Sequence, residues 1–385
     1  MHVETFIHKI LSSVIHKSRL KLLVCVLNAV IKTKQLKLTA LGRALDLPIQ
    51  ERSGIRKIDR FLGNIFFQKH NICIYQALIN IAIGAKTRPI IIVDWTQLSY
   101  NNLYVLRAAL ATESRAITLY EEIHTKKNEN NPRTQRRFLN ILKKLLPLGC
   151  KPIIVTDAGF RVPWFRDVLK LNWDYVGRVL HRRSCYGDKK GFKKCTNLHK
   201  LATAFPKYLG DMILNKINCL ETSFYIIKQK PKGRKHRLPN GRISKEDRSR
   251  LYAYNNNKPW LLVSSLKGTF AAKKVIEIYK KRMVIEESFR DLKSSQYGFG
   301  LRENKTIKNE RLTVWMLLSS LASFIAWIIG SIAESLNLHY QFQANSIKSR
   351  RVLSLFYLGC QIIRRNIKIP INFNKYDLDY REIYV

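Results

Sequence analysis

The spacing of apolar residues is helical over the first 80 or so positions. Residues 21–32 form a mostly apolar helical stretch, and 36–45 predict a small basic helix that begins at a capping Thr39. A third segment, 56–62, alternates basic and apolar residues on helical spacing. We therefore expect an all-α N-terminal domain over residues 1–80. Its basic face fits a DNA-binding bundle, and an ordinary solvated helix face is the alternative.

The pattern then becomes that of buried strands. Residues 89–93 are a continuous run dominated by β-branched residues that ends on Asp94, and 152–156 form a second run that ends on Asp157. The elements expected around them are strands over 104–111 and 116–123, helices over 134–146 and 163–171, and a short strand near 175–176. Three strands, helix, strand, helix, strand is the order of an RNase H-like core, with a mixed sheet and helices in an α/β fold.

The rest of the chain divides by composition. From 180 to 266 it is basic and less periodic, which predicts a β-rich insertion of short strands and loops. Helical spacing returns over 271–293, and an apolar segment follows from Leu312. The expected domain boundaries are a helical DNA-binding domain at 1–80, a first part of the core at 81–179, the insertion at 180–266, a second part of the core at 267–345 and a C-terminal region at 346–385.

The segment from Leu312 to Ala333 contains no charged residue and is long enough to cross a bilayer. It also contains four serines, and the chain has no second stretch of this kind. We therefore expect a helix buried inside the protein, with a membrane span as the alternative.

Charge points to a polyanionic partner. The chain of 385 residues has 69 Lys and Arg against 27 Asp and Glu, a formal net charge of +42, and 46% of its residues are hydrophobic. Such a field favours nucleic acid, because each phosphate neutralised by Lys or Arg releases condensed counterions. A ribosomal or chromatin-type structural protein could be equally basic, so charge alone indicates a class of partner and no reaction.

Cysteine usage and the first residues bear on the compartment. The seven cysteines are odd in number and scattered, with no C-x-x-C pair, which favours free thiols over disulfides or a cysteine-rich zinc site. The beginning of the chain lacks the basic-then-apolar order of a signal peptide. We expect a cytoplasmic, nucleoid-associated protein.

Carboxylates that end buried strands are candidates for chemistry. A charged group beside an apolar core is costly unless something pairs with it, and a divalent cation is one such partner. Mg²⁺ prefers oxygen ligands and usually combines one or two carboxylates with substrate phosphates. Asp94 and Asp157 fit this role, although strand ends also carry Asp as a turn former or helix cap.

A more informative pattern lies between 279 and 293. On one continuous helix, four polar residues would form a single stripe beside an apolar stripe: Tyr279, Arg282, Glu286 and Lys293. Glu287 and Asp291 would point elsewhere, so geometry prefers Glu286 as a metal-facing carboxylate. The alternative is a surface helix in which Arg282 and Glu286 form an i,i+4 ion pair.

The spacing Y-x₂-R-x₃-E-x₆-K of these four residues resembles the signature of the bacterial DDE transposases of insertion sequence family 4. Further stretches are similar to the insertion sequence ten members of that family, so the likeness runs from about residue 20 to 360; they are Ile92–Trp95, Thr156–Phe160, Val162–Trp164, Ile58–Arg60, Leu62–Asn64, Phe342–Asn345 and Arg351–Ser354. The tail from Ile369 does not match, which leaves open any dimer contact made there.

The resemblance implies roles. Asp94, Asp157 and Glu286 would converge as the catalytic triad and hold two Mg²⁺ ions, with Mn²⁺ as an alternative. Tyr279, Arg282 and Lys293 would contact DNA phosphates. Trp260 would stack on a base flipped out of the DNA, although a core Trp on a strand is an equal explanation. Arg43, Arg56 and Arg60 in the N-terminal bundle, with Arg234 and Lys235 in the insertion, would bind DNA.

The implied reaction is cleavage at transposon ends and strand transfer into target DNA by a cut-and-paste mechanism with a hairpin step. The resemblance also implies a homodimer in the synaptic complex and no membrane association. Three alternatives remain: an inactive or repurposed DNA-binding protein with this fold, a structural RNA-binding protein, and a membrane protein. Metal-dependent cleavage, preference for duplex DNA and solubility without detergent, respectively, distinguish them from a transposase.

Overall fold

The computed structural model describes residues 2–98, 102–113, 115–179, 184–188, 191–229, 242–244, 246–247, 258–344, 346–347 and 349–370. By contacts the chain divides into two compact units. The first unit comprises Met1–Glu129, Asn140–Cys150 and Met283–Val385, and the second comprises Asn130–Leu139 and Lys151–Arg282.

The first unit begins with six helices, as the helical spacing of the first 80 residues predicts: α1 (His2–Leu11), α2 (Lys17–Thr33), α3 (Leu38–Arg43), α4 (Glu51–Leu62), α5 (Ile65–Lys69) and α6 (Ile72–Ile83). The expected cap at Thr39 is wrong. Helix α3 is preceded by Lys37 at its N-cap, which makes no side-chain capping bond, so Thr39 lies inside the first turn. Helices α3 and α4 cross closely, because a Cβ on Gly54 would lie 2.3 Å from the Gly42 carbonyl oxygen.

Three antiparallel strands follow in the order β3-β2-β1: β1 (Ile90–Leu98), β2 (Leu103–Ala111) and β3 (Ala116–Thr125). The central strand β2 is buried at every position, which accounts for its nearly uninterrupted apolar sequence. The expectation that the first strand ends on Asp94 is wrong. Hydrogen bonding to β2 continues to Leu98 after burial diminishes at Trp95, so Asp94 lies within the strand.

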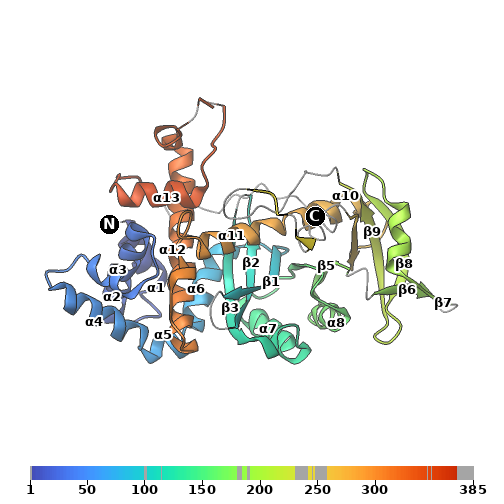
Figure 1. Ribbon diagram of the computed structural model, residues 1–385, viewed down its shortest axis with the longest axis horizontal. Helices are drawn as coiled ribbons and strands as arrows, with labels where there is room; N and C mark the ends of the chain where they lie inside the picture. Colours follow the sequence, from blue (N-terminus) through green and yellow to red (C-terminus); the bar gives the residue numbers. More distant parts are fainter. Residues whose placement is uncertain are drawn as a thin grey trace. The chain divides into compact units, whose positions relative to one another are not determined.

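The remaining elements of the first unit are η1 (Lys126–Asn128), the last part of α7 (Pro132–Leu145), α11 (Met283–Lys293), η3 (Leu301–Glu303), α12 (Asn309–Ser335), η4 (Leu338–Gln341) and α13 (Leu355–Arg364). Helix α12 contacts β3, α13 and the N-terminal helices α1, α2, α4 and α5 (Figure 1). Of the described helices, only α12 is long and apolar enough to cross a membrane.

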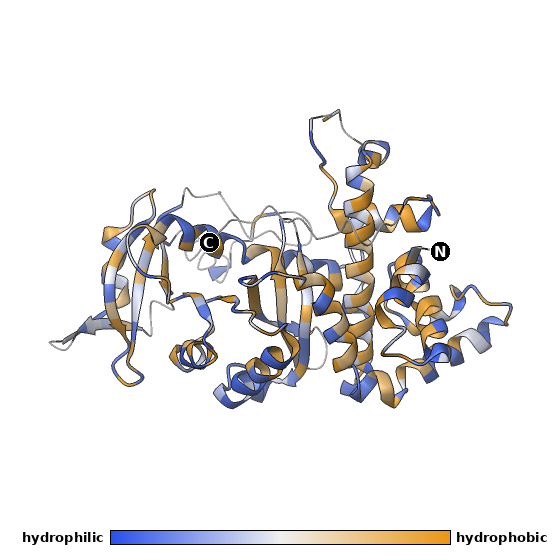
Figure 2. Cartoon of the chain, turned by 180° about the vertical axis from the view of Figure 1, so that it is seen from behind, coloured by the Kyte–Doolittle hydropathy of each residue, from blue (hydrophilic) through white to orange (hydrophobic). Residues whose placement is uncertain are grey.

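Burial accounts for the apolar composition of α12. The helix is apolar along most of its length (Figure 2), and 89% of the residues in its most apolar 18-residue stretch are buried inside the protein. Its contact with α13 is very close, because a Cβ on Gly330 would lie 1.9 Å from the Leu355 carbonyl oxygen. The prediction of a buried helix from Leu312 to Ala333 is therefore confirmed.

The second unit contains the elements β4 (Ile153–Thr156), α8 (Val162–Lys170), β5 (Asp174–Arg178), β6 (Cys185–Asp188), β7 (Gly191–Lys194), η2 (Cys195–Leu201), β8 (Lys207–Leu214), β9 (Leu220–Ile227), β10 (Trp260–Ser264) and α10 (Ala271–Lys280). Its sheet has the order β4-β5-β10-β9-β8-β6-β7, in which β4 and β5 are parallel and the other pairs for which a register is resolved are antiparallel. The strands β6 to β9 lie in the segment for which a β-rich insertion is expected.

The order of elements from β1 to β5 confirms the predicted succession of three strands, helix, strand, helix and strand. The single helix expected over 279–293 is wrong. Helix α10 ends at Lys280 and α11 begins at Met283, and the amides of Lys281 and Arg282 bond to carbonyls three residues back in a tight turn. The polar stripe is therefore divided, with Tyr279 on α10 and Glu286 with Lys293 on α11.

Candidate active site

Asp94 is held in a buried position on β1, directly opposite Arg107 of β2. Only 8% of its surface is exposed, and its Oδ1 accepts a hydrogen bond of 2.8 Å from the Trp95 amide. Arg107 is itself committed to a buried ion pair, because its Nε and Nη2 both donate to Glu121 Oε2 of β3. The Asp94 carboxylate is thus oriented by the backbone amide of Trp95, on a residue that pairs with the buried cation Arg107 across the strands.

Asp157 directly follows β4, as the buried run 152–156 predicts. Its Oδ1 accepts a hydrogen bond of 2.8 Å from the Gly159 amide, and this bond closes the turn after the strand. A Cβ on Gly159 would lie 3.0 Å from the same oxygen, so a larger residue would press on the carboxylate. Asp157 is half-buried, which leaves part of the carboxylate open to a ligand.

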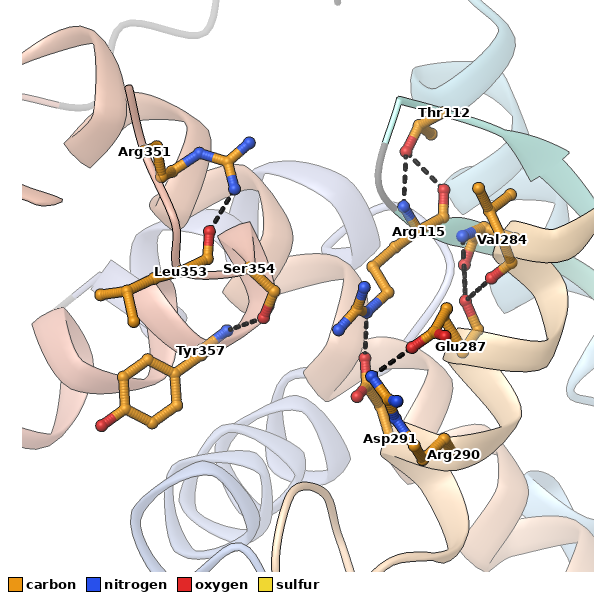
Figure 3. Close-up of polar contacts among 12 residues, drawn as sticks. Thr112, Arg115, Val284, Glu287, Arg290, Asp291, Arg351, Leu353, Ser354 and Tyr357 are labelled. Atoms are coloured by element: carbon orange, nitrogen blue, oxygen red, sulfur yellow. Dashed lines mark hydrogen bonds and ion pairs between the residues drawn. The ribbon is translucent and has the colours of Figure 1, made fainter. Parts of the chain in front are cut away.

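Glu286 is exposed on the first turn of α11, and other polar side chains of this helix fix the position of the helix. Ser288 Oγ accepts a bond from the Ala116 amide and donates to the Ala116 carbonyl, both at 2.9 Å, so it docks α11 on the first residue of β3. One turn further, Asp291 Oδ2 accepts a bond of 2.5 Å from Arg115 Nε (Figure 3). The helix carrying Glu286 is therefore attached at two points, to the first residue of β3 and to the residue before it.

Lys293 attaches the end of α11 to β1. Its Nζ donates to Thr96 Oγ1 and, at 2.7 Å, to the Gln97 carbonyl oxygen. Burial, with smaller contributions from the cations Arg302 and Arg107, lowers the pKa of Lys293 to about 8, and the nearby Asp94 opposes this change. Lys293 therefore lies near Asp94, and in this structure its ammonium contacts the strand that carries this carboxylate.

The other two residues of the divided stripe belong to the second unit. Tyr279 is 3% exposed and packs edge-on against Trp260 of β10, with ring centroids 5.1 Å apart. Burial raises the pKa of Tyr279, whereas the guanidinium groups of Arg282 and Arg178, the latter hydrogen-bonded to the phenol, lower it. The charge of Asp157 also raises the pKa of this phenol. Trp260 is half-buried, which is compatible with both a packing role and a stacking role.

The three carboxylates of the expected triad are divided between the units. Asp94 and Glu286 belong to the first unit, and Asp157 belongs to the second. Neither unit alone brings together, among its described residues, three His, Cys, Asp or Glu side chains that could hold a metal ion. Convergence of the three carboxylates therefore stays a prediction.

The remaining expected DNA contacts lie in two segments. Arg56 and Arg60 are exposed on α4, and in the described part of the chain neither makes an ion pair. Arg43 is exposed on α3, but its Nε is 3.1 Å from Glu51 Oε2, so a carboxylate already offsets its charge. Arg234 and Lys235 lie outside the described residues.

The pattern of apolar positions did not reveal the buried charges that fix these elements. Arg107 and Glu121 pair at 2.6 Å in the first unit, and Tyr75 and Ser320 also donate to Glu121. A lone Arg in the apolar strand 104–111 and an acid in the next strand was the signal available for this pair. For Arg115 with Asp291 there was no such signal, because 176 positions separate them in the sequence.

Comparison with known proteins identifies the family of this chain. No curated protein matches the chain. The family model described as transposase DDE domain matches residues 85–325, more than half of the chain, and this range contains Asp94, Asp157 and Glu286. The chain therefore belongs to the transposase DDE domain family.

Proposed function

We propose that the chain is a DNA transposase that cleaves phosphodiester bonds at transposon ends and joins the freed 3′ ends to target DNA, using Asp94, Asp157 and Glu286. The observation that carries the proposal is the family match, whose range holds all three carboxylates. The finer assignment, to insertion sequence family 4 with a cut-and-paste reaction through a DNA hairpin, rests on the Y-x₂-R-x₃-E-x₆-K spacing.

The donor set fits a divalent metal. All three candidates are carboxylates, the oxygen ligands that Mg²⁺ and Mn²⁺ prefer, and Asp94 carries its charge at a buried position where a cation would offset the cost. Two bound ions would activate the attacking oxygen and stabilise the leaving 3′ oxygen. We expect Asp94, Asp157 and Glu286 to hold them.

The chain's own groups have separate tasks in this proposal. The Trp95 amide orients Asp94, and the Gly159 amide orients Asp157, so neither carboxylate has to be ordered when substrate binds. Ser288 and Asp291 hold the helix that presents Glu286. Arg178 and Arg282, both near the Tyr279 phenol, supply positive charge to which a DNA phosphate can bind.

The test is a cleavage assay on duplex DNA taken from the flanks of the gene for this chain, with Mg²⁺, with Mn²⁺ and with chelator. We expect metal-dependent nicks with 3′-OH ends, followed by hairpin and strand-transfer products on a denaturing gel. Asp94→Ala, Asp157→Ala and Glu286→Ala should each abolish the nicks and leave DNA binding largely intact, because positive charge carries the binding.

Glu287→Gln is the matched control. Glu287 lies on α11 next to Glu286 and pairs with Arg290 of the same helix, so its loss removes one carboxylate without touching the triad. This variant should cleave at nearly the wild-type rate. Cleavage by any of the three Ala variants, or binding by the wild-type protein without metal-dependent cleavage, would contradict the proposal.

We further propose that the active form is a homodimer that pairs two transposon ends, and that it acts in the cytoplasm on chromosomal DNA. The resemblance to insertion sequence family 4 supports both. Light scattering of the protein with and without transposon-end DNA tests the first. A single protomer on each DNA end under cleavage conditions would contradict it.

A further inference from the structure

Helix α11 carries a buried aromatic ring between two polar residues of the candidate site. Phe289 follows Glu286 by one turn and precedes Lys293 by one turn, so the three residues lie on the same side of the helix. Only 6% of the surface of Phe289 is exposed. The guanidinium carbon of Arg107 lies 4.8 Å from the ring centroid, and Lys293 Nζ lies 5.8 Å from it. Arg107 of β2 therefore contacts the part of α11 that presents Glu286 and Lys293.

The guanidinium of Arg107 is held in one orientation by a buried network. Arg107 is 3% exposed, and its Nε and Nη2 donate to Glu121 Oε2 at 2.9 and 2.6 Å. The other oxygen of Glu121 accepts bonds of 3.2 Å from the Tyr75 hydroxyl on α6 and 2.7 Å from Ser320 Oγ on α12. Both carboxylate oxygens are thus engaged, so the guanidinium cannot turn without breaking bonds to β3.

Arg107 also lies beside the strand that carries Asp94. The two residues are directly opposite in the pairing of β1 with β2, so their side chains share one face of the sheet. Helix α11 contacts β1, β2 and β3, and Lys293 bonds to Thr96 and Gln97 of β1. Arg107 is therefore in contact with the helix of Glu286 and in register with the strand of Asp94.

Stability alone does not require an ion pair at this place. A buried pair can often be replaced by apolar side chains of similar size without loss of stability, because burial of two charges costs about as much as their attraction returns. A guanidinium differs from an ammonium in its rigid fork of donors and its flat face, which fix the groups on both sides of it. Such rigidity suits two carboxylates that must keep their geometry when they share metal ions.

We propose that Arg107 is a positioning residue for the carboxylate triad. Together with Glu121 it holds the Phe289 side of α11 against the sheet, and it thereby fixes Glu286 relative to Asp94. The proposal rests on the proposed function only in taking these carboxylates as the groups that cleave DNA. Arg107 is buried, so we expect it to touch neither DNA nor metal.

The main test is the paired variant Arg107→Met/Glu121→Gln, measured by single-turnover nicking of transposon-end DNA in Mg²⁺. It removes both charges together, and the amide oxygen of the new side chain can still accept from Tyr75 and Ser320. We expect the nicking rate at saturating DNA to fall about 100-fold, the usual effect of a displacement of about 1 Å. The Kd for DNA should change by less than about twofold, because Arg107 is not on the surface.

Arg107→Lys tests the shape of the guanidinium separately from its charge. The ammonium keeps the positive charge beside Glu121 and loses the fork and the flat face over Phe289. We expect this variant to nick about tenfold more slowly than the wild-type protein, again with little change in the Kd for DNA. A rate equal to that of the wild type would show that charge alone suffices and would overturn the positioning role.

Arg351→Met is the matched control for loss of stability. Arg351 Nε donates to Glu334 Oε1 of α12 at 2.6 Å, and its side chain is 15% exposed, so this variant also breaks a mostly buried pair of the first unit. We expect its urea midpoint to fall at least as far as that of the paired variant, whereas its nicking rate should stay within about twofold of the wild-type rate. Equal loss of rate in both variants would show that activity only follows stability, and would overturn the proposal.

Hydrogen exchange provides a readout that needs neither metal nor cleavage. In the paired variant the amides of α11 should exchange about tenfold faster than in the wild-type protein, and in Arg351→Met they should be unchanged. Unchanged exchange of α11, or a wild-type nicking rate in the paired variant, would overturn the proposal. If the wild-type protein itself gives no nicks, the proposed function fails, and the exchange of α11 still decides whether Arg107 holds this helix.

Discussion

Lys293 is a largely buried cation, and its burial makes its charge sensitive to pH. Its pKa is lowered to about 8 from an ordinary value of 10.5, chiefly by burial. Between these two values the unfolded chain binds more protons at this residue than the folded chain does. The contribution of Lys293 to the free energy of unfolding therefore rises with pH through this window.

Replacing Lys293 by Met removes the titrating group and keeps most of the apolar stem. We expect the urea midpoint of the wild-type protein, relative to that of Lys293→Met, to increase between about pH 8 and about pH 10. Denaturation curves followed by circular dichroism at several pH values measure the difference. A difference that is constant or decreases with pH would show that burial does not control this ammonium.

Cysteine reactivity gives a second test at this scale. Burial raises the pKa of the Cys195 and Cys360 thiols to about 12, whereas Cys219 is exposed. The thiolate is the reactive form, so near pH 8 a thiol with such a pKa holds about a thousandfold less of it than an unperturbed thiol. Iodoacetamide should label Cys219 first, and peptide mass spectrometry should find Cys195 and Cys360 unlabelled until denaturant is added. Labelling of Cys360 at the rate of Cys219 would contradict this.

At the scale of elements, the attachment of α11 to β3 is the feature on which the candidate site most depends. Arg115 and Asp291 are mostly buried, with side chains 16% and 8% exposed, so loss of one partner leaves the other charge poorly solvated. Burial raises the pKa of Asp291, and the charge of Arg115 and its hydrogen bond to Asp291 oppose that change.

Asp291→Ala should lower the free energy of unfolding by about 3 kcal/mol, the usual cost of breaking a buried pair on one side. Arg115→Met in the same chain should restore part of this loss, and a double-mutant cycle in urea measures the coupling. Breaking the exposed pair Glu287–Arg290 of the same helix by Glu287→Gln should cost less than about 1 kcal/mol. Equal costs for the two pairs would show that α11 is held by packing alone.

Elements with their own sequence period were predictable, and their ends were not. The runs 89–93 and 152–156 are apolar because both become buried strands, and α12 is apolar because the first unit buries it. The break between α10 and α11 carries no such signal. Lys281 and Arg282 are good helix formers, and no Gly or Pro marks the turn, so tertiary structure overrides local propensity there.

The same limit applies to the candidate site. The position of Asp157 directly after a strand could be predicted, because β4 ends where the apolar run ends. The prediction that Asp94 ends its strand was wrong, since β1 continues beyond it through hydrogen bonds to β2 that leave no mark in the apolar pattern. Partners such as Ser288 with Ala116 come from distant parts of the chain and require the fold.

At the scale of the whole molecule, we expect the net charge to determine the affinity for DNA. A formal net charge of +42 implies many phosphate contacts, and each phosphate neutralised contributes about −0.9 to the slope of log K against log salt. The contributions should differ among the exposed arginines of the N-terminal helices. Arg56 and Arg60 make no ion pair with any described residue, whereas Arg43 shares its charge with Glu51.

Replacing Arg56 and Arg60 together by Gln should therefore reduce the magnitude of the salt slope by about 1.8, which corresponds to two lost phosphate contacts. Arg43→Gln should change the slope by less, because Glu51 already offsets the charge of Arg43. If α4 contacts the transposon ends, the double variant should weaken binding to end sequences more than to unrelated duplexes. Equilibrium titrations at four or more salt concentrations measure these slopes. A flat response of the wild-type protein, or an unchanged slope in the double variant, would contradict this account of how charge and α4 bind DNA.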